Sequence, residues 1–550
     1  MIKKIKIKNI VLLLSLLMMT GCDFMDCDES DNFTKQEVLD SYNRVKQLAT
    51  NVYGFLKADF CSIDGAMLDA ATDDAVHIYK SSNIQRFVDG TWSANNLVDN
   101  VWGHYYKGIR AANFYLKETA GLTFDEWKYS DDYEAIMKEF TNYQYEVRFL
   151  RAYFYFELIK RYRNIPFVLD VLAQNEANGV NPESYEKIAK FIVDECSDLA
   201  QILPVNYDNF STKEKGRVTR AAAMALKSRV TLYMASPLFS EDSEDKWKQA
   251  AEAAYDIIKQ KTDLGLDLVP YPQIFNNQKA EVILYRPTGE SGDFEKANFP
   301  IGVEGGKTST CPTQNLMEAY DMKDGTPFVW NNQSDPYDNR DPRMKYTIVC
   351  NEMKWPVDPV EIWEGGTNGL PLQNATTTGY YLKKYVNNTI SFEAGSTVTK
   401  KQHNWVLFRY GEILLNYAEA MINAFHDPNY KDAVYNMSAR EAVNQIRGRT
   451  NISLPGFPSD ITEKDFVKRL KNERRVELAF EGHRFWDVRR WKELGQTANI
   501  YGVKITKNNE VISYEKFLLE TRAVTDNMYF YPIPNTERFK NPNLGQNLGW

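Results

Sequence analysis

The chain has 550 residues, of which 43% are hydrophobic and 25% are charged, a composition typical of globular proteins. This length exceeds the size at which one compact core usually stops growing, so we expect several modules or an extended helical array. The net charge is −8 and becomes about −12 without the four lysines near the N-terminus. Such an acidic chain argues against nucleic acid or an anionic membrane surface as a partner.

The N-terminus has the pattern of a secretory signal. Four lysines precede an apolar run over residues 10–19, which is too short to cross a bilayer as a helix. Thr20, Gly21 and Cys22 follow, and small residues before a cysteine are typical of a bacterial lipobox, in which the cysteine is acylated. We therefore predict a signal peptide over residues 1–21, lipidation at Cys22 and a lipidated acidic tether over residues 22–35. An ordinary cleaved signal with an incidental cysteine is the alternative.

Helical patterns dominate residues 36–270. Apolar residues recur at helical spacing in 102–116, 147–158, 221–236 and 247–258, and several of these positions are alanine. Small residues let neighbouring helices approach closely, as in stacked helical hairpins such as tetratricopeptide (TPR) units. The sequence therefore predicts an N-terminal TPR-like helical region over residues 36–270.

The pattern changes from residue 271 to residue 404. Gly, Pro, Asn and Thr cluster there, and short apolar runs at 281–285 and 380–386 predict strands between long loops. Helical spacing resumes at 409–424, 439–449 and 462–492. We expect a loop-rich segment over 271–404, inserted into one domain that a C-terminal helical region over 405–550 completes. Loops on such a scaffold could line a functional face.

Catalytic motifs are weak in this sequence. The segment 302–308, GVEGGKT, has one residue too few for a phosphate-binding loop, the five histidines are scattered, and there is no GxSxG elbow. We therefore predict no catalytic residue and no cofactor. A glycoside hydrolase stays an alternative, because two well-placed carboxylates would suffice and the chain has 74 acidic residues. The six cysteines specify neither a disulfide framework nor a zinc site, and calcium in the acidic loop around Asp427 is left open.

Several motifs in the chain resemble those of one family. Residues 473–491 read ERRVELAFEGHRFWDVRRW, which is the longest and most specific of them. The others are 146–153 EVRFLRAY, 216–219 GRVT, 335–343 DPYDNRDPR, 377–381 TTGYY, 409–420 RYGEILLNYAEA, 444–447 NQIR, 531–534 YPIP and 541–550 NPNLGQNLGW. Along nearly its whole length the chain resembles the SusD-like (RagB/SusD) family of outer-membrane nutrient-binding lipoproteins.

The resemblance implies a fold and a function. The implied fold is mainly α, a TPR-like helical hairpin array with an inserted loop-rich segment that contains short strands. The implied protein is not an enzyme: it is lipid-anchored in the outer membrane, exposed at the cell surface, and passes captured oligosaccharide to a SusC-like TonB-dependent barrel. A subunit that binds peptide or only gates the transporter is a further alternative.

Sugar recognition requires flat aromatic faces and polar side chains that read hydroxyl groups, and these are expected in loops. By analogy with the family, two loop regions supply candidates, with Trp92 the leading one. The first region holds Asp73, Asp74, Arg86, Trp92 and Asn95, and the second holds Tyr285, Arg286, Phe294, Trp330 and Trp363. The charged residues of the 473–491 motif are expected instead to form a buried structural ion network, namely Arg474, Glu477, Glu481, Arg484 and Asp487.

Overall fold

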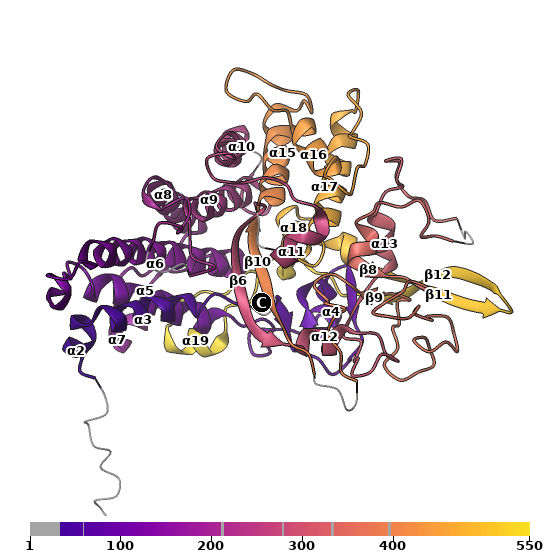
Figure 1. The fold of residues 1–550 in the computed structure, drawn as a ribbon, viewed down its shortest axis with the longest axis horizontal. Helices are drawn as coiled ribbons and strands as arrows, with labels where there is room; N and C mark the ends of the chain where they lie inside the picture. The colour runs from indigo at the N-terminus through magenta and orange to yellow at the C-terminus, as the bar shows by residue number, and fades with distance from the viewer. Residues whose placement is uncertain are drawn as a thin grey trace, which may run out of the picture.

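The computed structural model describes residues 33–58, 60–210, 214–241, 243–277, 280–331, 335–393 and 398–550. The predicted signal peptide, Cys22 and most of the predicted tether lie outside the described residues. Helices dominate, and the strands pair two by two into small sheets (Figure 1). The expected mainly α fold with short strands is confirmed.

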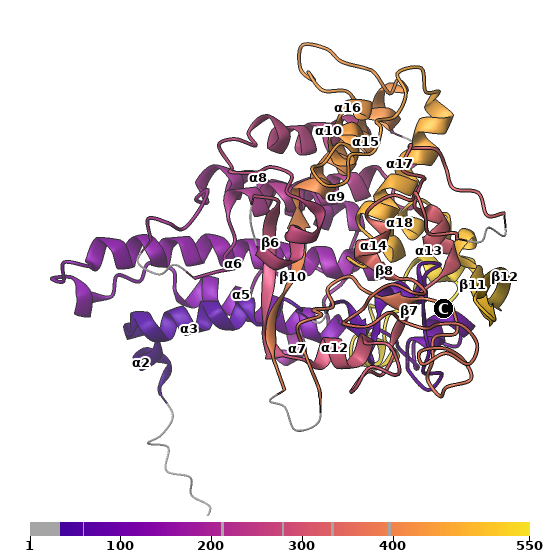
Figure 2. The same ribbon diagram turned by 45° about the vertical axis from the view of Figure 1, so that its right-hand side comes forward.

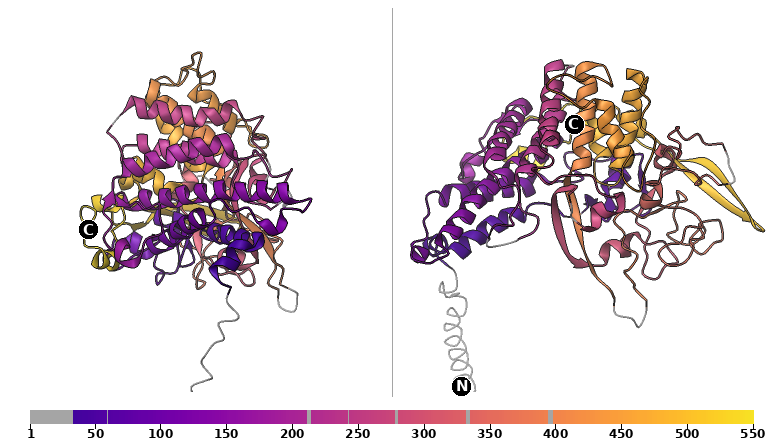
Figure 3. Two further views of the ribbon diagram at one scale, coloured as in Figure 1. Left: turned by 90° about the vertical axis from the view of Figure 1, so that its left-hand side faces the viewer. Right: turned by 45° about the horizontal axis from the view of Figure 1, so that its top comes forward.

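The first half of the chain forms a layered stack of helices (Figure 3). Its helices are α2 (Lys35–Asp40), α3 (Tyr42–Tyr53), α5 (Trp102–Glu118), α6 (Tyr133–Tyr162), α8 (Tyr185–Ile202), α9 (Arg220–Ala235) and α10 (Glu244–Lys259). Successive members pack against each other: α5 on α6, α6 on α8, α8 on α9 and α9 on α10. This is the arrangement that the helical spacing predicted.

Helix α9 shows why alanine is needed in such a stack. It lies between α8 and α10, and its alanines at positions 221, 222, 223 and 225 are buried. A side chain of one carbon lets both neighbours approach the α9 backbone closely. The serine caps at the starts of α8 and α10, Ser184 and Ser243, accept hydrogen bonds from backbone amides three residues on, which satisfies donors that the helix leaves open.

The chain leaves the stack after α10 and returns to it with α15 (Tyr410–Phe425), which packs directly on α10. Helices α16 (Ala439–Arg447) and α17 (Glu463–Glu477) then pack against α15, and α18 (Arg484–Arg490) follows (Figure 2). The residues between α10 and α15 therefore form an insertion into the helical array. The shorter helices are α4 (Gln85–Asp89), α7 (Gln174–Ala177), α11 (Ile274–Asn277), α12 (Asp293–Asn298), α13 (Gln314–Ala319), α14 (Met344–Thr347) and α19 (Asn535–Lys540).

An antiparallel pair of strands joins the two ends of the insertion. Strand β6 (Val282–Ser291) pairs with β10 (Lys401–Arg409), so that Arg286 lies opposite Trp405. Both predicted strand segments contain strands, but β6 is longer than expected and β9 (Tyr381–Leu382) is shorter. The remaining short strands are β1 (Ser62–Ile63), β2 (Ala66–Met67), β3 (Ala75–His77), β4 (Ile165–Pro166), β5 (Pro182–Glu183), β7 (Thr310–Pro312) and β8 (Ile348–Val349).

The C-terminal region is not purely helical, contrary to the expectation for 405–550. Strands β11 (Asn499–Asn508) and β12 (Val511–Thr521) form an antiparallel hairpin that projects from the body (Figure 1). Its turn contains Asn509 at a φ of 55°, a conformation that asparagine tolerates well. The sequence did carry this signal, because Ile500, Val503 and Ile505 are buried along one strand that ends in an Asn-Asn turn.

The main hydrophobic core is shared by all these regions. It includes buried side chains from Leu39 in α2 to Leu544 near the C-terminus, and the insertion contributes residues such as Leu316 and Tyr380. The loops of the insertion are therefore mounted on the same core as the helices, which gives any site they form a fixed geometry.

Candidate functional site

The charged residues of the 473–491 motif form a buried network. Glu477 in α17 accepts hydrogen bonds from Arg343 (2.9 Å), Arg409 (2.8 Å) and Arg449 (2.6 Å). Burial alone would raise the pKa of Glu477, but these guanidinium groups outweigh it and hold the pKa well below its usual value. The expected structural network is confirmed, although most of its partners come from outside the motif.

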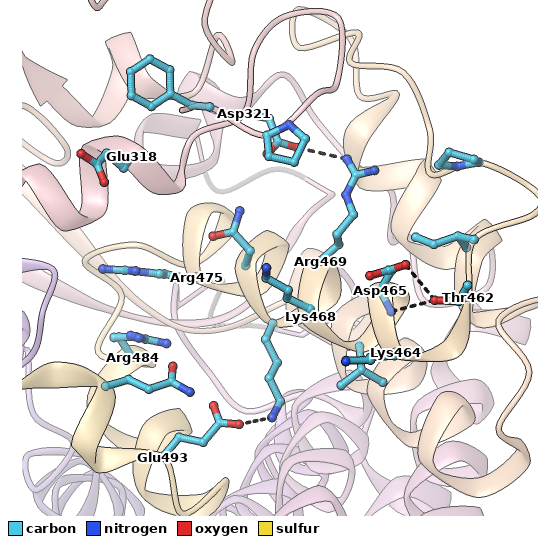
Figure 4. Close-up of a pocket in the computed structure, with 18 of the residues that line it drawn as sticks. Glu318, Asp321, Thr462, Lys464, Asp465, Lys468, Arg469, Arg475, Arg484 and Glu493 are labelled. Carbon is cyan, nitrogen blue, oxygen red and sulfur yellow. Dashed lines mark hydrogen bonds and ion pairs between the residues drawn. The ribbon is translucent and has the colours of Figure 1, made fainter. Parts of the chain in front are cut away.

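A large cleft lies beside α17, and its lining includes Lys464, Lys468 and Arg475 of that helix (Figure 4). Its volume is about 960 Å³, at the upper end of the range for ligand sites. Helix α17 forms one wall, α13 contributes Glu318, and the loop after α13 contributes Asp321, Pro327 and Phe328. The other polar lining residues are Asp460, Thr462, Lys464, Asp465, Lys468, Arg469, Lys471, Asn472, Arg475, Arg484, Glu493 and Gln496.

Basic residues recur along the cleft face of α17. Lys464, Lys468, Lys471 and Arg475 follow one another at spacings of four, three and four, which places them on one helical face. Thr462 caps the start of the helix by accepting a hydrogen bond from the Asp465 amide at 3.2 Å. The cleft wall is therefore a regular helix with a stripe of cations.

Two arginines at one end of the cleft are held by a pair of aspartates. Arg475 Nε donates to Asp74 at 2.6 Å and its Nη2 lies 2.9 Å from Asp73, while Arg484 donates to both oxygens of Asp73 at 2.9 and 3.0 Å. Burial alone would raise the pKa of Asp73, but Arg475 and Arg484 outweigh it and lower the pKa. Asp73 and Asp74 are buried and do not line the cleft, so they orient its arginines and are not placed to contact a ligand there, contrary to the expectation.

The structure also corrects the leading candidate, Trp92. Its side chain is 2% exposed, and its ring lies 4.7 Å from Phe87, 5.3 Å from Tyr531 and 4.5 Å from Trp550. A ring enclosed by other aromatic rings offers no face for a sugar. Sequence reasoning placed Trp92 in a loop but could not show that the C-terminal segment covers that loop.

The remaining candidates of the first region lie apart from the cleft. Arg86 in α4 bonds to Asn96, and Asn95 is exposed and accepts a hydrogen bond from Asn535 at 2.8 Å. Neither Arg86 nor Asn95 lines the cleft. The structure therefore separates the candidates of this region into a buried tryptophan, two anchoring aspartates and two residues near the α19 end of the chain.

The second region is likewise dispersed. Tyr285 and Arg286 lie in β6, opposite Val406 and Trp405 of β10. Phe294 in α12 packs against Phe60, with ring centroids 4.6 Å apart. These residues sit on the β6–β10 ribbon and its flank, and none of the three lines the cleft.

The two tryptophans of this region have different surroundings. Trp330 is partly buried and lies in the loop whose Pro327 and Phe328 border the cleft, with its ring 6.4 Å from that of Phe328. Trp363 is partly buried and has the Lys507 ammonium group of β11 above its ring at 4.5 Å. Among the aromatic candidates, Trp330 is therefore the closest in sequence to a residue that lines the cleft, Phe328.

Sequence reasoning missed the basic stripe of α17. The helix itself was predicted, and the spacing of Lys464, Lys468, Lys471 and Arg475 could have been read from the sequence. A stripe of lysines on a helix is usually a solvated face, so only the tertiary structure shows that this one borders a cavity.

Metal sites and membrane-spanning helices are two further features that bear on function. Within these ranges, no group of three or more His, Cys, Asp or Glu side chains is arranged to hold a metal ion, and this includes the loop around Asp427. No helix in the described part of the chain has the length and apolarity needed to span a bilayer.

Comparison with known proteins identifies the family. A profile of the SusD family matches residues 280–550, and a second profile, described as starch-binding and associating with the outer membrane, matches residues 23–232. The chain belongs to the SusD/RagB family. Among curated SusD-like relatives, protein P2 of Formosa agariphila is 23% identical over 469 residues, which cover 82% of this chain and 80% of the relative.

Solved SusD-like structures share the whole fold. A SusD-like protein from Bacteroides fragilis is 26% identical with a TM-score of 0.76, covering 94% of this chain and 99% of that one. A SusD-like carbohydrate-binding protein from the same species is 24% identical with a TM-score of 0.74, covering 92% of this chain and 100% of that one. The SusD-like fold is therefore established over nearly the entire described chain.

Proposed function

We propose that the protein is a cell-surface, glycan-binding lipoprotein of the outer membrane that captures oligosaccharides without cleaving them. Membership of the SusD/RagB family carries this proposal. The profile that matches residues 23–232 is described as starch-binding and associating with the outer membrane, and a similar Bacteroides fragilis chain is described as carbohydrate-binding.

The α17 cleft supplies a surface suited to such a ligand. It combines guanidinium, ammonium, amide and carboxylate groups with the ring of Phe328, and Trp330 lies in the same loop. Stacking and hydrogen bonds each contribute about 1 kcal/mol, whereas association opposes binding by several kcal/mol, so we expect dissociation constants of roughly millimolar to micromolar. Weak binding suits a protein that must release what it captures.

The proposal extends to an anchor and a partner. Cys22, outside the described residues, would carry the lipid, and a SusC-like TonB-dependent barrel would receive the ligand. Copurification from native membranes tests the partner: a barrel of this class should accompany the protein. The wild type should incorporate a labelled fatty acid and Cys22→Ala should not, and equal labelling of the variant would contradict lipidation at Cys22.

A glycan screen on the isolated protein tests the central claim. The purified protein, without its signal peptide, should retard on affinity gels containing at least one polysaccharide and release no reducing sugar from it. Release of reducing sugar would favour a glycoside hydrolase. Failure to bind any glycan, with a barrel still copurifying, would favour a gating or peptide-binding subunit.

A further inference from the structure

The hydrogen-bond donors of the cleft are not all used within the protein. Arg475 and Arg484 each engage Asp73 or Asp74 through Nε and Nη2. The Nη1 atom of each has no partner among the described residues, and neither Nη1 is sealed from solvent. The side chains of Arg475 and Arg484 are 12% and 7% exposed, and in each the Nη1 group is the one left without a partner, within the described ranges, at the cleft that they line.

Two lysines of α17 add further hydrogen-bond donors to the Nη1 groups of Arg475 and Arg484. Lys468 and Lys464 are exposed, and within the described part of the chain neither has an ion-pair partner. Figure 4 shows Arg475 and Arg484 one beside the other at one end of the cleft, with Lys468 further along the same wall. The free donors therefore lie on one wall.

Most of the acidic residues that line the cleft already have an ion-pair or hydrogen-bond partner within the protein. Glu318 pairs with Lys516 at 2.8 Å, and Glu493 pairs with Lys471 at 2.5 Å. Asp321 is shared by Arg447 at 3.2 Å and Arg469 at 3.3 Å. Asp465 accepts from Thr462 at the start of α17, which leaves Asp460 as an exposed carboxylate without a partner among the described residues.

A neutral sugar both donates and accepts through its hydroxyl groups, and Asn472 and Gln496 supply amides of that kind, but apart from Asp460 the charged lining groups that keep free hydrogen-bond capacity are positive. Arginine and lysine are donors only, and a free NH₂ group of a guanidinium, like an ammonium group, donates charge-assisted hydrogen bonds to the oxygens of a carboxylate or sulfate. On the basis that the protein binds glycans as stated above, we propose that the α17 cleft recognises an oxyanion on the sugar, either a uronate carboxylate or a sulfate ester. Lys468 and the Nη1 atoms of Arg475 and Arg484 are the groups that bind it.

Calorimetry with three probes tests this assignment: oligogalacturonates, sulfated galacto-oligosaccharides and neutral galacto-oligosaccharides of matched length. The intact mature protein should bind at least one charged probe more tightly than the neutral one, and added salt should weaken that binding. The two charged probes distinguish a carboxylate from a sulfate. Lys468→Gln should weaken binding of the preferred charged probe about five-fold, as expected for an exposed ion pair.

Lys468 is exposed, so its substitution should not disturb folding. Lys187→Gln is the matched control, because Lys187 is an exposed lysine of α8 outside the cleft, and this variant should bind as the wild type does. Equal or tighter binding of the neutral probe would overturn the oxyanion assignment and leave the glycan-binding function intact. Charged binding that Lys468→Gln leaves unchanged would show that the site is elsewhere, and binding of no glycan in this assay or on affinity gels would overturn both proposals.

Discussion

Arg484 in α18 donates two hydrogen bonds to the carboxylate of Asp73, from Nε at 2.9 Å and from Nη2 at 3.0 Å. The two residues are 411 positions apart in the sequence, so this contact joins the segment just before β3 to the most specific motif of the family. The same Asp73 also holds Arg475. One buried carboxylate therefore fixes both guanidinium groups at the end of the cleft.

Asp73→Asn should destabilise the protein strongly, because it removes both carboxylate hydrogen bonds of Arg484, which is largely buried, and leaves the partly buried Arg475 with Asp74 as its carboxylate partner. We expect a loss of about 3–5 kcal/mol in the free energy of unfolding, measured by urea denaturation. Asp170→Asn is the control, since Asp170 pairs with Lys117 at the exposed surface and should leave the unfolding midpoint unchanged. A wild-type midpoint for Asp73→Asn would show that the pair is not structurally important.

Trp92→Ala should act on stability and not on ligand recognition. Removing a ring that is 2% exposed creates a cavity, and we expect a loss of about 3–5 kcal/mol in the free energy of unfolding. Trp92→Phe should lose less because it keeps an aromatic ring among Phe87, Tyr531 and Trp550. Folded Trp92→Phe protein should bind glycan with wild-type affinity. Weakened binding by a stable Trp92→Phe variant would show that Trp92 belongs to the ligand site.

Trp330→Ala should weaken glycan binding about five-fold, the loss of one stacking contact of roughly 1 kcal/mol. Trp363→Ala is the matched comparison, since Trp363 is also a partly buried loop tryptophan but lies in another loop, below the Lys507 ammonium group of β11, whereas Trp330 shares its loop with the cleft residues Pro327 and Phe328. Calorimetry on both variants with a glycan found by the affinity-gel screen measures the effect. A loss confined to Trp363→Ala would move the ligand site toward the β11–β12 hairpin.

Glu419 predicts an acid-dependent loss of stability. It accepts hydrogen bonds from Arg490 Nη1 (2.5 Å), Arg490 Nη2 (2.7 Å) and Trp491 Nε1 (2.7 Å). Burial opposes ionisation, but Arg490 outweighs it and lowers the pKa of Glu419 from 4.5 to about 2. Because the folded state holds the proton less tightly than the unfolded state, the stabilisation is fully present above pH 4.5 and is lost as the pH falls through about 2.

The free energy of unfolding that is lost when Glu419 becomes protonated is on the order of 3 kcal/mol. Urea unfolding between pH 5 and pH 2 should therefore show a smaller pH dependence for Glu419→Gln than for the wild type, together with lower stability at neutral pH. Glu510→Gln serves as the control because that side chain is 95% exposed and should leave the slope unchanged. Equal slopes for the wild type and Glu419→Gln would contradict the depressed pKa.

Local spacing predicted the helices well and the strands less well. The apolar periodicity of 102–116 and 247–258 corresponds to α5 and α10, since one face of each helix packs against a neighbour in the stack. The β11–β12 hairpin lies within the region predicted to be helical, although alternation and a turn are present in its sequence, because helical spacing precedes it over 462–492. Strand segments are short, so periodicity alone assigns them poorly.

Three of the predicted site residues lie at or near the cleft, and the others do not. Asp73, Asp74 and Trp330 are associated with the cleft, but the aspartates act through Arg475 and Arg484, and Trp92 is in the core. Burial of a loop residue depends on what covers it, and for Trp92 the cover includes Trp550 at the far end of the chain. Such contacts leave no periodic signal in the sequence.

By itself the sequence determined the family, the helical array and the place of the insertion, because these depend on motifs and on residue periodicity along single elements. Only the tertiary structure decided which loop residues face solvent and where the cavity lies. Both follow from packing between segments hundreds of residues apart, as the contact of Asp73 with Arg484 shows. In the sequence, Lys468 is an ordinary surface charge. It lines a cleft because the loop that holds Asp321, Pro327 and Phe328 borders the same cavity as α17.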